Sequence, residues 1–148
     1  MEQLNNTISM MGDVELTLRD VNGNIKHHTE VKNLVVSGGK NWIASRMIGA
    51  SDAVMSHMAI GTGSITPSAG NTTLVVEVGR VALTSALRTN NQVTYSAFFA
   101  AGVGTGGIQE AAIFNSSTVG TMLCRTVFAT INKDSLDTLT INWTVTVI

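Results

Sequence analysis

Apolar and polar residues alternate along much of this chain, and the alternation is most regular from Thr138 to Val147. One parity of this segment holds large apolar residues, and the other holds threonine and asparagine. Successive side chains of a β-strand point to opposite faces of the sheet. The pattern therefore predicts an antiparallel strand with one buried face. The residues expected in the core are Leu139, Ile141, Trp143, Val145 and Val147.

A hairpin is predicted near the N-terminus. Alternating residues run from Asp13 to Asp20 and return from Ile25 to Lys32, on either side of the sequence Val-Asn-Gly-Asn. Asn22 and Gly23 tolerate the positive φ angles that a tight hairpin turn requires. We therefore expect these two segments to pair with each other.

Only one helix is expected. Trp42, Ile43 and Met47 lie at helical spacing in the segment from Lys40 to Ile48. The preceding pair, Gly38 and Gly39, is expected to break a short strand, and Gly49 is expected to end the helix. The other predicted strands are 34–37, 55–60, 80–88, 93–100, 108–115 and 122–130. Segment 71–78 is consistent with either a helical turn or a strand.

Many short strands separated by turns, with a single helix, predict a mainly β fold. The pattern is typical of an antiparallel sandwich or barrel, and we expect a jelly-roll-like β-sandwich. At 148 residues the chain is long enough for one domain. Residues 1–12 lack a clear period and are interpreted as an extended N-terminal arm, followed by a single domain at 13–148.

Charged residues make up 13% of the chain, which is about half the usual share, and the net charge is −1. A free soluble monomer usually carries more charge, so the shortfall indicates a surface partly covered by other chains. A compact β domain that stays monomeric is the alternative. Lys and Arg are spread singly, which argues against nucleic acid as a partner. Neither a signal peptide nor a membrane helix is expected.

A glycine pattern raises the possibility of nucleotide binding. Gly102, Gly104 and Gly107 match G-x-G-x-x-G. That pattern binds a pyrophosphate where the loop opens a helix inside a parallel β-α-β unit. The short segment that follows and the lack of β-α alternation favour a bent connection between strands instead. No cofactor is expected.

Histidine and cysteine give no sign of a metal or nucleophilic site. His27 and His28 point to opposite faces of a strand and cannot chelate one metal together, while His57 would need a tertiary contact to join either. The single cysteine, Cys124, lies in an apolar run and is interpreted as a core-filling thiol.

Two acids, Glu77 and Glu110, lie in apolar surroundings. A buried acid usually has an arginine partner, so pairing with Arg80 or Arg125 is favoured over general acid catalysis. The sequence contains no nucleophile-elbow motif. We therefore expect no enzymatic activity and no catalytic residues.

Several segments of the second half share a recognisable pattern. They read A-I-G-T-G at 59–63, E-V-G-R at 77–80 and I-Q-E-A-A-I-F-N at 108–115, followed by the closing strand of alternating threonine and apolar residues. In these motifs, residues 33–148 resemble small virion proteins of tailed bacteriophages, including tail-fibre and tail-collar domains. One departure is Ala112, where we expect glycine.

The resemblance implies a non-enzymatic building block of the virion, made in the cytoplasm of a bacterial host. A capsid decoration or cement protein that stabilises the shell fits best, because the chain lacks long repeats or a coiled-coil stem. A tail fibre, fibre adaptor or collar protein for host attachment is the alternative. Carbohydrate binding for host attachment is a third hypothesis, and it requires an exposed tryptophan or tyrosine. Tyr95 shares its parity with core residues, which argues against such a surface.

The expected partners are further copies of the chain, as a dimer or trimer, and other virion proteins, above all the major capsid protein. Nucleic acid and membranes are not expected partners. Within the arm, the apolar residues predicted to contact a partner are Leu4, Ile8 and Met10.

Overall fold

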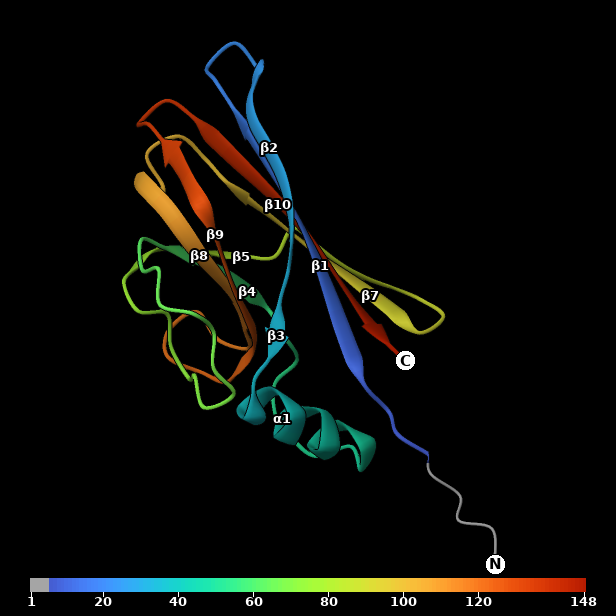
Figure 1. Cartoon of the computed structure of the whole chain (residues 1–148). Coiled ribbons are helices and arrows are strands. Elements are labelled where there is room, and N and C mark those ends of the chain that lie inside the picture. The colour runs from blue at the N-terminus through green and yellow to red at the C-terminus, as the bar shows by residue number, and fades with distance from the viewer. Residues whose placement is uncertain (1–5) are drawn as a thin grey trace, which may run out of the picture.

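The computed structural model describes residues 6–148, which form two five-stranded antiparallel sheets packed face to face (Figure 1). One short helix lies at one end of this β-sandwich. The mainly β fold with a single short helix is therefore confirmed. No helix in the described part of the chain is long and apolar enough to cross a membrane.

The sheet that contains the N-terminal strand is called the first sheet, and the other is called the second sheet. In spatial order, the first sheet contains β2 (Ile25–Lys32), β1 (Met10–Arg19), β10 (Thr138–Val147), β7 (Gln92–Phe99) and β6 (Ser85–Thr89). The second sheet contains β3 (Leu34–Val35), β9 (Met122–Lys133), β8 (Gly106–Phe114), β4 (His57–Gly61) and β5 (Glu77–Ala82). Helix α1 (Ser37–Met47) follows β3.

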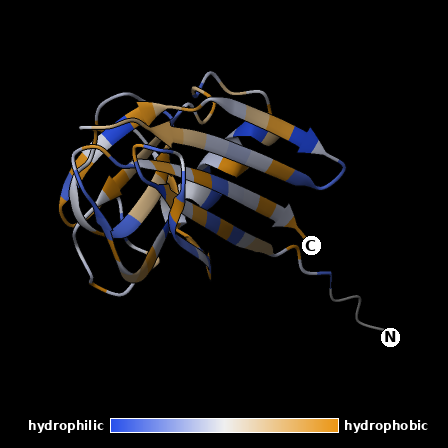
Figure 2. Ribbon diagram, turned by 90° about the horizontal axis from the view of Figure 1, so that it is seen from above, coloured by the Kyte–Doolittle hydropathy of each residue, from blue (hydrophilic) through white to orange (hydrophobic). Residues whose placement is uncertain are grey.

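Strand β10 lies at the centre of the first sheet, between β1 and β7. Its residues alternate between buried and half-buried, as the sequence predicts. Trp143 is fully buried at the core, whereas Val147, at the end of the strand, is 40% exposed. Apolar and polar bands alternate along the strands in Figure 2. The two inner faces together form the main core.

The second sheet is buried on its outer face as well as its inner face. Segment 62–76 lies over the outer face and encloses a second apolar cluster. The members of this cluster are Val36, Ala59, Leu74, Ala112, Phe114 and Met122. Ala112 is fully buried there, so its methyl group fits at the position where glycine is expected. Because of this cover, polar side chains on the outer face are also removed from water.

The hairpin between β1 and β2 is confirmed, with Gly23 at a φ of +85°. The carboxylate of Asp20 accepts hydrogen bonds from the backbone N–H groups of Asn22 and Asn24, both at 2.9 Å. At the other end, β1 begins at Met10, so the last three residues of segment 1–12 belong to the strand.

The predicted start of the helix is wrong. The helix begins at Ser37 rather than Lys40 and includes Gly38 and Gly39, which the sequence predicts to end the preceding strand. A Cβ atom at Gly39 would lie 2.2 Å from the carbonyl oxygen of Leu123. The glycine therefore allows the first turn to approach β9 closely. The end is as predicted, because Gly49 has a φ of +65°.

The single strand predicted over 80–88 is also wrong. The segment contains parts of two strands, β5 and β6, which belong to different sheets. The chain crosses between them at Leu83, whose N–H donates to Ser56 O, and Thr84, whose N–H donates to Ser96 O. Alternation continues through the crossing, so the sequence pattern gives no sign of it.

Candidate functional site

The most deeply buried charges of the described chain form one ion pair. Glu110 of β8 and Arg125 of β9 lie on the outer face of the second sheet, and neither side chain is exposed. Arg125 aligns with Ala112, so it lies diagonally across from Glu110. Its Nη2 and Nε atoms donate to Glu110 Oε2 at 2.9 and 3.2 Å. The predicted pairing of this acid with an arginine is confirmed.

The same carboxylate also holds segment 62–76 on the sheet. It accepts hydrogen bonds from the backbone N–H groups of Gly63, Val75 and Val76, at 3.1, 3.0 and 2.8 Å. Five donors therefore surround one carboxylate, which offsets the loss of its hydration. Both ends of the covering segment are tied to Glu110.

Asn71 ties the middle of the covering segment to the same pair. Its Oδ1 atom accepts from Arg125 Nη1 at 3.1 Å and from the backbone N–H of Ser68 at 2.8 Å. The Glu110–Arg125–Asn71 network thus joins two strands and the long segment. We call it the loop-holding network.

Two glycines of the A-I-G-T-G segment leave room for this network. A Cβ atom at Gly61 would lie 2.5 Å from Glu110 Oε1, and one at Gly63 would lie 2.6 Å from the same atom. Real Cβ atoms do not approach an oxygen this closely, so any larger residue would displace the carboxylate. The two glycines and Glu110 belong to two of the shared sequence segments, and here they meet.

Arg80, from the E-V-G-R segment, makes a second polar cluster nearby. Its guanidinium lies 3.8 Å from the centre of the Phe114 ring. It donates to both carboxylate oxygens of Glu77, at 3.1 and 2.7 Å, and to the carbonyls of Ser116 and Val119, each at 3.0 Å. The predicted pairing of Glu77 is therefore also confirmed. These contacts hold β5 against the 115–121 turn.

Cys124 and Tyr95, which the sequence raises as candidates for a nucleophile and a sugar-binding residue, are both buried in the core. Cys124 is fully buried, and burial raises the pKa of its thiol far above the ordinary value. Burial likewise raises the pKa of Tyr95 to about 12. Tyr95 is only 7% exposed and so does not present the aromatic surface that carbohydrate binding requires.

Gly102 and Gly104 lie in the loop between β7 and β8, and Gly107 is the second residue of β8, so the pattern leads into a strand. Gly102 and Gly104 have φ angles of +80° and +67°. The loop carries the chain from the first sheet to the second. Its interpretation as a bent connection is confirmed.

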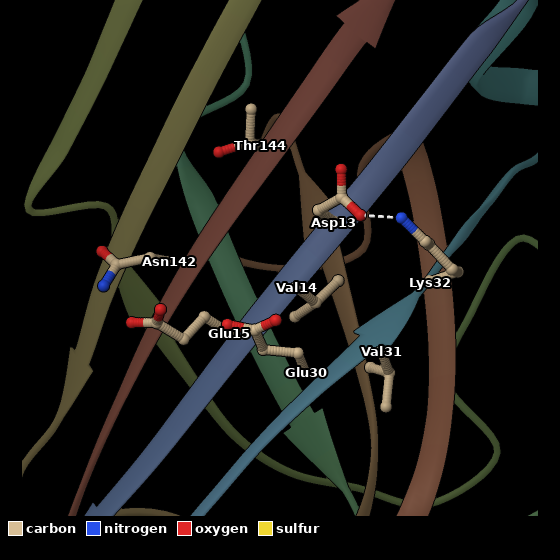
Figure 3. Close-up of a pocket in the computed structure, with 8 residues that line it drawn as sticks. All are labelled: Asp13, Val14, Glu15, Glu30, Val31, Lys32, Asn142 and Thr144. Atoms are coloured by element: carbon tan, nitrogen blue, oxygen red, sulfur yellow. Dashed lines mark hydrogen bonds and ion pairs between the residues drawn. The ribbon is translucent and has the colours of Figure 1, made fainter.

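A pocket on the outer face of the first sheet is lined mainly by polar side chains of β1, β2 and β10 (Figure 3). Glu15 and Glu30 are directly opposite each other on β1 and β2, and ligand atoms of these acids and His28 lie within 4.8 Å of one another. Asp13 and Lys32 form an ion pair beside them. These donors are chemically suited to a divalent cation, but they lie on an exposed face where water surrounds them. We interpret them as a solvated sheet surface.

The predicted partner contacts of the arm fall in three different settings. Leu4 lies outside the described residues. Ile8 is 73% exposed, and Met10 is partly buried at the start of β1, against the main core. Ile8 and Met10 line an apolar groove of about 570 Å³ that Ile43 of α1 and Leu34 of β3 close on the other side. The sequence pattern gives no indication of this groove, because α1 and the arm meet only in the fold.

Comparisons of the chain with protein-family models, with curated proteins and with solved structures give no match. The resemblance to phage virion proteins therefore depends on the sequence motifs alone and stays a prediction.

Proposed function

We propose that this chain is a non-enzymatic structural protein of a tailed bacteriophage virion, and that it decorates and stabilises the capsid shell. The proposal combines the resemblance in the sequence with the way the shared segments are used. The observation that carries it is the meeting of Gly61, Gly63, Glu110 and Arg125 in one buried network. These residues hold the fold together, as expected of motifs that are shared for structural reasons.

The buried charges are hydrogen-bonded to other protein groups, which supports a role without catalysis. Glu110 accepts five hydrogen bonds, and Arg125 donates to both Glu110 and Asn71. A general acid or base needs a free path for its proton to a substrate, and a carboxylate enclosed by five donors lacks one. The decoration role is preferred to a fibre because residues 6–148 form one sandwich without repeats or a coiled-coil stem.

The test is a copy-number count in purified particles of the phage that encodes the chain, by quantitative mass spectrometry against the major capsid protein. We expect a number of copies close to that of the capsid protein, or a simple fraction of it. A few copies to a few tens of copies per particle would instead indicate the tail and support the fibre or adaptor role. Absence from the particle would overturn the virion proposal.

A further inference from the structure

We propose that the N-terminal segment Thr7–Met11 pairs antiparallel with the same segment of a second copy and joins the two first sheets across a twofold axis. The basis is an uncovered strand edge. Strand β2 pairs with β1 from Asp13 to Arg19 and not further toward the N-terminus. The last contact on this side is the hydrogen bond from Asn33 N–H to Gly12 O, at 3.2 Å. In Figure 1 this end of β1 lies beyond β2, at the end of the molecule where α1 lies.

The hydrogen-bonding alternation shows which backbone groups are free. Ser9 and Ile148 exchange both backbone hydrogen bonds, at 2.9 and 2.8 Å. In an antiparallel pair such residues alternate with residues that point away, so Ile8 and Met10 direct their N–H and C=O groups away from β10. In agreement, Val147, opposite Met10, bonds to Asn91 on its other side. Among residues 6–148, no strand is hydrogen-bonded to Ile8 or Met10 on the free side, where Leu34 of β3 lies across the groove.

The composition of this edge differs from that of the other edge strands. Natural sheets protect exposed edges with charges, proline or very short strands. Strand β2 carries two lysines, two histidines and a glutamate, β5 carries Glu77 and Arg80, β6 carries Arg88, and β3 has two residues. Residues 3–12 contain no charge and no proline. A second copy of the same segment therefore meets it without charge repulsion.

The side chains of the segment are complementary to themselves. With the twofold axis at Ser9, Ile8 of one copy lies opposite Met10 of the other, in hydrogen-bonded pairs. Ile8 and Met10 share one parity and line the apolar groove beside α1. The pairing therefore removes an exposed isoleucine from water and extends apolar cover over the groove in both copies. An isologous contact of this kind closes as a dimer.

The first experiment measures the molar mass of the purified full chain over a range of concentrations by size-exclusion chromatography with light scattering. We expect a dimer for the wild type. Met10→Pro removes an N–H that faces the free edge, and Ile8→Lys introduces charge repulsion across the axis. Each is expected to weaken dimerisation about tenfold or more. Leu87→Lys, on β6, is the matched control because Leu87 is 66% exposed, and it is expected to remain a dimer.

The second experiment tests the register. Ser9→Cys places two thiols opposite each other in a non-hydrogen-bonded pair, where the separation of the Cα atoms suits a disulfide. We expect an oxidised, cross-linked dimer, while Thr89→Cys on β6 stays unlinked. Cys124 is buried and does not compete. A wild type that is monomeric at every concentration, or a dimer whose Ser9→Cys variant stays unlinked, would overturn the proposal.

The pairing and the proposed virion role are tested by different measurements. A dimer in solution with no copies in particles would leave the pairing intact and overturn the proposed function. A chain that is monomeric in solution but abundant in particles would overturn the pairing and support the proposed function.

Discussion

At the scale of single residues, Glu110 carries the strongest constraint in the described chain. Burying a carboxylate and a guanidinium costs several kcal/mol per ion, and the attraction between them repays this only with further hydrogen bonds. Here the further bonds come from the backbone of Gly63, Val75 and Val76. The pair therefore serves to fix one arrangement of segment 62–76.

Glu110→Gln tests this directly. The substitution leaves Arg125 as a buried charge without a counterion, and we expect a loss of about 3 to 5 kcal/mol in the free energy of unfolding, measured by urea denaturation. Glu77→Gln is the matched control, because the Glu77 side chain is 36% exposed. Its loss is expected to stay below about 1 kcal/mol. Equal losses in the two variants would contradict the role assigned to burial.

The glycines of the A-I-G-T-G segment provide a second test. Gly63→Ala places a methyl group against the Glu110 carboxylate and the Val75 side chain, and we expect a loss of about 1 to 3 kcal/mol in the free energy of unfolding. Gly70→Ala lies in the same covering segment with no atom within 4 Å of the new methyl group. It is expected to be neutral or slightly stabilising. If the two variants lose the same stability, close packing at residue 63 is not the cause.

Asp137 makes stability depend on pH. The hydrogen bond from the Lys26 ammonium, at 2.7 Å, lowers the pKa of Asp137 below its ordinary value. Because the folded pKa is lower than the unfolded one, the stabilisation is present above the unfolded pKa and is lost as pH falls through the folded pKa. The stability difference between wild type and Asp137→Asn is therefore expected to shrink between about pH 6 and about pH 2. Urea midpoints at both pH values measure it, and a constant difference would contradict the assignment.

At the scale of elements, the sequence predicts strands with one buried face well and crossings between sheets poorly. The alternation of β10 identifies its buried residues because one side of that strand faces the core along nearly its whole length. Alternation does not reveal that the chain changes sheet at Leu83 and Thr84, since both strands there keep the same period. The sequence does not predict the helix start, because Gly39 is explained only by its close tertiary contact with Leu123.

The loop-holding network could be predicted only in part. An acid in an apolar segment indicates that a partner is needed, and this reasoning gives Arg80 and Arg125 as the candidates without assigning either to Glu110. It does not identify Val75, Val76 or Asn71, because their contacts join residues 34 to 54 positions apart in the sequence. The closely spaced glycines at 61 and 63 are the one sequence signal that something approaches the chain there.

At the scale of the whole molecule, the outer faces of the two sheets differ in how they are covered. The second sheet is closed by segment 62–76, and the outer face of the first sheet is polar, with Thr94 bonded to Thr144 and Ser96 to Asn142. Three of the exposed apolar residues, Ile8, Met11 and Ile148, lie where the N-terminal end of β1 meets the C-terminal end of β10. The pairing proposed above would cover part of this apolar surface.

The structure favours point variants over deletion of the N-terminal arm as a test of its contacts. Removing residues 1–12 would delete Met10, Met11 and Gly12 from β1 and uncover their partners on β10. Loss of function in such a truncation would not separate an interaction from misfolding. Point variants at Ile8, which is exposed, avoid this difficulty.

We propose that the chain is a structural subunit of the virion and that its N-terminal edge contributes to assembly, and incorporation of variants into particles tests both points. Wild type, Ile8→Lys and Leu87→Lys would be supplied in equal amounts during phage growth, and their ratio in purified particles measured by mass spectrometry. We expect wild type and Leu87→Lys to be incorporated equally and Ile8→Lys to be depleted about tenfold or more. Equal incorporation of all three would contradict a role of the N-terminal edge in assembly, and absence of all three from the particle would contradict the virion proposal.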